Sequence, residues 1–396
     1  MNNFSVVTDP TAQVEAGVTK RSFACVILEA LLLAVIAGYG WGTFEDFIPL
    51  SLLLAAAWSI APNRFWAGAV AVVYYCTASR GLPIGAATYF EMNLASGVVL
   101  WVAGCCLLAI PFALLWSKSS IKKFLAFPLV LVIVSVPPFG VFGWTNPLVT
   151  AGVIFPGTGL AGLAITAFLV AVLAWMPRVY MGVGFIVAAL FFVPDSESRI
   201  PAGWEGVNTS ERFETGNADH VKTFLRQQEQ VNQVRIAEGE KVLFPESAAG
   251  LWTDATAKLW RDNPPIKPVF IGAEVLAGEG LDNALIAIRS EGFEVLYKQR
   301  MPVPISMYRP WDERSTNAYW FADPVVDIAG DKAGILICYE SLLVWPVLHS
   351  AMSADYLVSI GNFWWAKDTS IPAIQSASMK AWAALFNLPL VTASNR

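Results

Sequence analysis

The chain changes chemical character near Pro194. Before that residue, long apolar stretches alternate with short polar breaks, and after it charged and amide side chains occur at the density of a globular domain. Over the whole chain 56% of the residues are hydrophobic and only 14% are charged, whereas soluble domains carry about 25% charged residues. The contrast predicts two domains of unlike chemistry, 1–194 and 195–396, the first of them in a membrane.

The apolar stretches of the first domain predict an α-helical transmembrane bundle. A hydrocarbon core about 30 Å thick needs about 20 apolar residues per helix. By that criterion we expect about seven spans, of which the third and seventh are short, at 22–40, 47–62, 65–79, 94–116, 124–142, 158–176 and 179–193. Within the first span, Glu29 is either a carboxyl paired with a neighbouring helix or a functional group inside the membrane.

The loops between these spans set the expected orientation. Every loop with an excess of Lys and Arg lies on the same side as the N-terminus, and basic loops stay preferentially in the cytoplasm. We therefore expect a multi-pass protein of a bacterial inner membrane with its N-terminus in the cytoplasm. Seven crossings would then place residues 195–396 in the periplasm.

The composition also argues against several classes of function. The formal net charge is −5, and without a basic cluster we expect no nucleic-acid binding. The chain has only two histidines, His220 and His349, which argues against a His-rich metal site and against a histidine-based nucleophile mechanism. We expect no cofactor and no metal ion.

Strand-like runs alternate with helical stretches after residue 195, which is typical of an α/β layer fold. The expected strands lie at 241–244, 268–276, 284–288, 293–297, 334–338 and 355–360. The expected helices lie at 218–237, 250–262, 341–353 and 370–386. In α/β folds the ends of strands are where reactive side chains collect.

Three of these strands end in polar or reactive side chains, namely Glu246, Lys298 and Cys338. A cysteine beside a lysine has more thiolate, a carboxylate can accept the thiol proton, and an ammonium can stabilise an oxyanion. Each residue taken alone is more often structural: a core cysteine, a turn glutamate and a solvated lysine. Together they form a set that could carry out nucleophilic catalysis without histidine.

The segments LFPES (243–247), YKQRMPVP (297–304) and GILICYE (334–340) resemble motifs of the nitrilase, or carbon–nitrogen hydrolase, superfamily. ADYLVSIGNFWW (354–365) is similar to the segment that follows the nucleophile in that superfamily. The preceding apolar region makes the whole layout resemble apolipoprotein N-acyltransferases, and the TraB family of conjugal transfer proteins shares it. The resemblance implies an α–β–β–α sandwich.

The resemblance also implies a role for each motif residue. Glu246 would be the general base, Lys298 the oxyanion partner and Cys338 the nucleophile. The N–H of Tyr339 would join the oxyanion hole, and Glu340 would be a supporting carboxylate. In such acyltransferases a phospholipid donates its acyl group to the cysteine as a thioester, and the amine of a lipoprotein accepts it.

Two departures from the family pattern leave an alternative open. Met307 stands where the family has a glutamate, and the chain ends at TASNR (392–396), where the acyltransferases continue. We therefore expect a sandwich shortened at its C-terminus. The alternative is a catalytically inactive nitrilase-fold scaffold that serves conjugation or envelope assembly. The aromatic residues of 363–365, 319–321 and Trp311 either guide an acyl chain or belong to the core.

Overall fold

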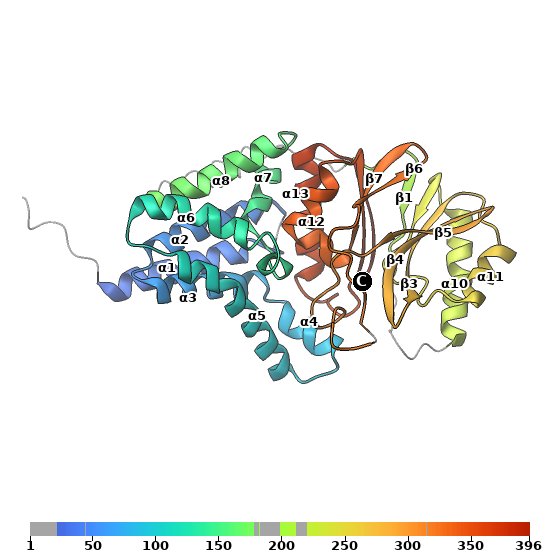
Figure 1. Cartoon of the computed structure of the whole chain (residues 1–396), viewed down its shortest axis with the longest axis horizontal. Helices are drawn as coiled ribbons and strands as arrows, with labels where there is room; N and C mark the ends of the chain where they lie inside the picture. The colour runs from blue at the N-terminus through green and yellow to red at the C-terminus, as the bar shows by residue number, and fades with distance from the viewer. Residues whose placement is uncertain (1–21, 44, 178–181, 183–198, 211–219, 314) are drawn as a thin grey trace, which may run out of the picture.

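The structure is a computed structural model in which a helical half and a mixed α/β half lie side by side (Figure 1). It describes residues 22–43, 45–177, 182, 199–210, 220–313 and 315–396. The two halves meet at the helices that cover one face of the α/β half.

The helical half contains eight α-helices in the described residues, and all but one of them have 17 residues or fewer. They are α1 (Phe23–Tyr39), α2 (Leu53–Ile60), α3 (Arg64–Ala78), α4 (Leu82–Tyr89), α5 (Leu94–Leu115), α6 (Ser120–Ile133), α7 (Thr150–Ile154) and α8 (Leu160–Trp175). Short 3-10 helices at Glu45–Leu52, Phe139–Val141 and Pro147–Val149 complete the half.

The predicted seven-span bundle is wrong. The structure has, among the described residues, one helix that is long and apolar enough to cross a membrane, Leu94–Leu115, with a mean hydropathy of 2.6. The other apolar runs break into shorter pieces. The run at 47–62 divides into a 3-10 helix that contains Pro49 and the 8-residue α2. The run at 124–142 leaves α-helical geometry after Ile133 and has only a three-residue 3-10 helix beyond it.

Helix length is the physical reason for this correction. The 16 residues of α8 rise about 1.5 Å each, so α8 is about 24 Å long, against a hydrocarbon core of about 30 Å. The seventh predicted span, 179–193, lies outside the described residues except for Gly182. The predicted multi-pass topology is therefore wrong as well. In it, basic loops placed the N-terminus in the cytoplasm and seven crossings placed the second domain in the periplasm.

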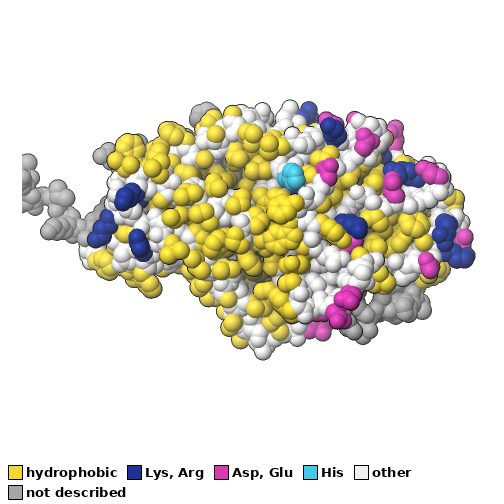
Figure 2. All heavy atoms as spheres, viewed as in Figure 1, with side chains coloured by type: hydrophobic (Ala, Val, Ile, Leu, Met, Phe, Trp, Pro, Cys, Tyr) yellow, Lys and Arg dark blue, Asp and Glu magenta, His cyan; other side chains and the backbone are white. Residues whose placement is uncertain are grey.

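The two halves differ in the polarity of their surfaces, as they differ in their content of charged residues. On the face drawn in Figure 2, apolar side chains cover much of the helical half, whereas most of the charged side chains gather over the α/β half. In α5 only 28% of the most apolar 18-residue window is buried.

In its described residues, the α/β half consists of two sheets with two helices outside each. The first sheet has the order β1-β2-β3-β4-β5, and its strands are Trp204–Gly206, Lys241–Leu243, Val269–Ala277, Gly280–Arg289 and Gly292–Lys298. The second has the order β6-β7-β8-β9, and its strands are Val325–Ile328, Asp331–Ile337, Tyr356–Asn362 and Leu390–Asn395. The predicted strands of this half are therefore present.

Helices cover the outer faces of the two sheets (Figure 1). The first sheet is covered by α10 (His220–Ile236) and α11 (Asp254–Asp262), and the second by α12 (Val344–Ala351) and α13 (Ile371–Phe386). One apolar core lies between the sheets, and a second lies between the first sheet and α10 and α11.

Alternation along β4 and β5 decides which side chains reach the space between the sheets. Leu285 and Tyr297 belong to the core between the sheets, whereas Ile286 belongs to the core under α10 and α11. Successive side chains of a strand point to opposite faces. Lys298, which follows Tyr297, therefore points away from the second sheet, and Gln299 points towards it.

The helical half packs directly onto the outer helices of the second sheet. A single apolar cluster joins residues of α1 to α8 with residues of α12 and α13. At the contact of α7 with α13, a Cβ on Gly152 would lie 1.7 Å from the backbone oxygen of Ala381, so only glycine fits there. Close to the second sheet, the hydroxyl of Tyr339 donates a hydrogen bond of 2.7 Å to the carbonyl of Val141.

Candidate active site

Cys338 occupies a strained turn directly after β7. Its φ is +50°, a left-handed conformation that costs a non-glycine residue about 1–2 kcal/mol. The 3-10 turn Cys338–Leu342 follows at once, and the side chain of Cys338 is buried, with 8% exposure. A cysteine that only fills the core needs no such strain, so this backbone favours the functional interpretation of Cys338.

Glu246 faces Cys338 across the space between the two sheets. The Asn283 amide donates to Glu246 Oε1 at 2.6 Å, and the Cys338 thiol lies near enough to the Glu246 carboxyl for each group to shift the pKa of the other. Burial raises the pKa of Glu246 to about 7, although interactions with Cys338, Asn283 and the backbone N–H of Asn362 act in the opposite direction. A carboxyl that titrates near neutrality suits a general base.

The thiol of Cys338 is not a preformed thiolate. Burial raises its pKa well above the usual range, and the negative charge of Glu246 raises it further. The backbone N–H groups of Asn362 and Tyr339 partly oppose that rise. The sulfur therefore needs a base at the moment of attack, and it already lies beside two N–H groups that could stabilise an oxyanion.

Lys298 does not point into this site. Its Nζ forms an ion pair of 2.7 Å with Asp282 and lies 5.2 Å from the centre of the Tyr319 ring. The Lys298 side chain is 44% exposed, and the interaction with Asp282 raises its pKa. The strand therefore directs the predicted oxyanion partner to the face opposite Glu246 and Cys338.

Gln299 lies where the predicted triad would need its third member. It is 1% exposed, and its amide nitrogen donates to the carbonyl of Ile337, directly before Cys338, at 3.0 Å. Its amide oxygen accepts a hydrogen bond of 2.9 Å from Asn283, which also holds Glu246. A neutral amide thus connects the base to the turn that carries the nucleophile. The sequence signal for Gln299 was its position two residues after Tyr297, because side chains two residues apart in a strand point to the same face of the sheet.

Glu340 fastens the turn after Cys338. Its carboxyl is fully buried and accepts hydrogen bonds from the backbone N–H groups of Ile337, Arg300 and Met301 at 2.7, 2.6 and 3.1 Å. The Tyr297 hydroxyl also donates to it at 3.0 Å. Glu340 therefore joins the end of β7 to the segment after β5, which is a supporting function.

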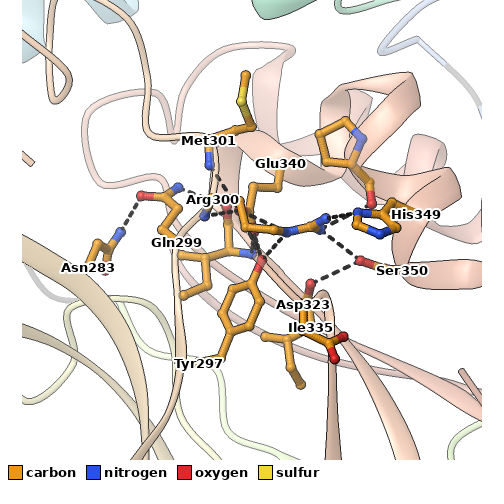
Figure 3. Close-up of polar contacts among 12 residues, drawn as sticks. Asn283, Tyr297, Gln299, Arg300, Met301, Asp323, Ile335, Glu340, His349 and Ser350 are labelled. Atoms are coloured by element: carbon orange, nitrogen blue, oxygen red, sulfur yellow. Dashed lines mark hydrogen bonds and ion pairs between the residues drawn. The ribbon is translucent and has the colours of Figure 1, made fainter. Parts of the chain in front are cut away.

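Arg300 is the buried cation opposite Glu340. Figure 3 shows it between the first sheet and α12, where it donates to the Tyr297 hydroxyl, the Pro346 carbonyl and the Ser350 hydroxyl. Its Nε lies 3.9 Å from Glu340 Oε1, and its Nη1 lies 3.2 Å from His349 Nδ1. Burial and the charge of Arg300 lower the pKa of His349, so that histidine is a structural partner.

The aromatic residues singled out in the sequence divide between the two interpretations. Phe363 is buried and belongs to the core. Trp311 and Phe321 are exposed, at 73% and 85%. Trp364 and Trp365 contact Tyr89 of α4, which no sequence pattern connected to the site.

Comparison with known proteins assigns a family to this arrangement. The family model of the carbon–nitrogen hydrolases matches residues 78–384. The conjugal transfer protein TraB of Agrobacterium fabrum (strain C58) is 36% identical over 397 residues, which cover 93% of each chain. A probable conjugal transfer protein TraB of Sinorhizobium fredii is 36% identical over 373 residues, covering 91% of this chain and 96% of that protein. An amidase from Nesterenkonia sp. superimposes on 50% of this chain and 77% of its own, with 14% identity and a TM-score of 0.35.

Proposed function

This chain belongs to the carbon–nitrogen hydrolase family, and we propose that it is an acyl-transfer enzyme, an amidase or N-acyltransferase, in which Cys338 carries the acyl group as a thioester. The observation that supports this most is the strained, buried Cys338 held against a carboxyl whose pKa is about 7. A nucleophile that is activated by an adjacent general base is a usual requirement of covalent catalysis.

The proposed reaction uses Glu246 twice. Its carboxylate takes the thiol proton while the sulfur attacks the carbonyl carbon of an ester or amide, and the N–H of Tyr339 stabilises the oxyanion. The carbonyl then re-forms, and the departing alcohol or amine takes the proton from Glu246. In the second half, water or an amine attacks the thioester, Glu246 takes a proton from it, and the sulfur leaves and recovers that proton.

Gln299 supports this reaction in a different way from the lysine that the family resemblance implies. It contributes no charge, and its hydrogen bonds to Ile337 and Asn283 fix the distance between the turn and the base. Phospholipids as acyl donors and amines as acceptors, the pair implied by the resemblance to N-acyltransferases, are the first substrates to test.

Covalent labelling tests this proposal directly. The protein is incubated with p-nitrophenyl butyrate or with a phospholipid, digested, and mapped by mass spectrometry. We expect an acyl adduct on Cys338, no such adduct in Cys338→Ser, and an undiminished adduct in Cys106→Ser, which alters an exposed cysteine. An adduct found only on other cysteines, or none with any donor, would contradict the proposal.

A second candidate is a catalytically inactive nitrilase-fold component of conjugal transfer. It is favoured by the neutral Gln299 beside Glu246, by Met307 in place of a glutamate, and by the names of the two TraB relatives. Conjugation frequency separates the candidates. Cys338→Ala and Glu246→Gln should behave like a deletion if the protein is an enzyme, and like the wild type if it is a scaffold.

A further inference from the structure

A second carboxyl faces the site from β3. Glu274 lies directly opposite Asn283 in the β3–β4 register, and side chains so paired lie on the same face with their Cβ atoms about 5 Å apart. Asn283 is the residue that holds both Glu246 and Gln299. Burial raises the pKa of Glu274, and the charge of Glu274 in turn raises the pKa of Glu246.

Two acceptor groups at this place lack donors. Asn283 is 2% exposed, and although its amide nitrogen donates twice, its Oδ1 has no hydrogen-bond partner in the described part of the chain. The Glu274 side chain is half-buried, and its carboxyl forms no hydrogen bond or ion pair with the side chains that the structure describes. A buried acceptor without a donor, such as Asn283 Oδ1, is costly by about 1–3 kcal/mol. A ligand that brings N–H groups would satisfy both.

An aromatic ring from the helical half borders the same place. Burial and then the charges of Glu246, Glu274 and Cys338 together raise the pKa of Tyr89 to about 12. The ring stacks on Trp364 at 6.4 Å between centroids and meets Trp365 edge-on at 6.1 Å. The positive charge of Arg309 also acts on Tyr89, and Arg309 is itself paired with Asp312 at 3.2 Å.

We propose that Glu274, Asn283 Oδ1 and the ring of Tyr89 form the acceptor subsite, and that it binds a protonated primary alkylamine. The carboxylate and the amide oxygen accept two N–H bonds, and an aromatic face attracts a cation that lies within about 6 Å. The inference rests on the proposed function, because the amine is the group that would receive the acyl chain from Cys338.

The transfer step balances with groups that are present. The ammonium gives one proton to Glu274, and the lone pair so freed attacks the thioester carbon. The C–S bond breaks as the second nitrogen proton passes through Glu246 to the sulfur. The products are an amide and the free thiol, and Glu274 then returns its proton to water.

Binding of n-butylammonium tests the subsite without any reaction. Ligand-observed NMR titrations would compare n-butylammonium with n-butanol on the wild type, on Glu274→Gln and on Glu279→Gln, which alters an exposed glutamate near the end of the same hairpin. We expect Glu274→Gln to weaken n-butylammonium about tenfold or more, and Glu279→Gln to leave it unchanged. Tyr89→Leu should weaken it several-fold and Tyr89→Phe should not. Equal binding of n-butylammonium and n-butanol to the wild type, or equal effects of the two glutamate variants, would overturn the proposal.

The rates at which two acceptors take the acyl group from the acylated protein separate this inference from the proposed function. Acyl-Cys338 is mixed with n-butylamine or with hydroxylamine, which is uncharged at neutral pH. The ratio of the n-butylamine rate to the hydroxylamine rate should fall about tenfold in Glu274→Gln and stay constant in Glu279→Gln. Failure to acylate Cys338 together with selective n-butylammonium binding would end the proposed function and keep the subsite. Acylation of Cys338 together with a rate ratio that Glu274→Gln leaves unchanged would keep the proposed function and end the subsite.

Discussion

Replacing Glu246 with glutamine should slow the acylation of Cys338 by about 10²–10⁴-fold, the range expected when a general base is removed. The thiol has a pKa raised by burial and by Glu246, so without the carboxylate it has no acceptor for its proton. Single-turnover release of p-nitrophenol measures the rate, and Glu279→Gln is the matched control. A rate within tenfold of the wild type would contradict the role given to Glu246.

The same substitution should change the pH profile. Glu246 acts as a base only when it is ionised, so wild-type acylation should rise with pH through about 7. Glu246→Gln should lack that rise.

The free energy of unfolding should fall over the pH range in which the acylation rate rises. The folded state raises the pKa of Glu246 from 4.5 to about 7, so it binds the proton more tightly than the unfolded chain does. The contribution of Glu246 to stability is therefore most favourable at low pH and is lost as the pH rises through about 7. Above that pH, Glu246→Gln should raise the free energy of unfolding, by up to about 3 kcal/mol.

Replacing Glu340 with alanine should lower the free energy of unfolding by about 3–5 kcal/mol, because it leaves the fully buried Arg300 without its counter-charge. It also removes the acceptor of three backbone N–H groups around the turn of Cys338. Urea denaturation followed by circular dichroism measures the loss.

The matched control for Glu340 is an ion pair at the surface. Arg289 and Glu294 form one, with side chains 30% and 54% exposed, and such pairs contribute about 0–1 kcal/mol. Glu294→Ala should therefore have a small effect. Similar losses in Glu340→Ala and Glu294→Ala would contradict the buried network as a support of the turn.

Periodicity and strand-end reasoning recovered much of the α/β half. Six predicted strands and four predicted helices correspond to observed elements, because short β-branched runs between turn residues leave few alternatives. Glu246 and Cys338, 92 positions apart, were both expected at strand ends and face one another.

The role predicted for Lys298 stays a prediction, and the register of β5 explains why its side chain is found beside Asp282. The residue type suggested an oxyanion partner, but a strand turns successive side chains to opposite faces, and Tyr297 fixes the face that looks onto the second sheet. Gln299 therefore reaches the site, and Lys298 pairs with Asp282.

The error in the helical half was one of length. Hydropathy measures the length of an apolar run, and a run need not be one helix. Prolines and turns cut the apolar stretches into short pieces. Asn283, Glu274 and Tyr89 could not be predicted as site residues, because only the β3–β4 register and the packing of α4 bring them near Cys338.

The central claim is that Gln299, and not Lys298, completes the site of Glu246 and Cys338. Its most direct test is the rate of Cys338 acylation in Lys298→Met and Gln299→Leu, measured side by side. We expect Lys298→Met to acylate at the wild-type rate and Gln299→Leu to be slower by about tenfold or more, because two buried hydrogen bonds are lost. Wild-type acylation by Gln299→Leu together with loss of acylation in Lys298→Met would contradict the claim.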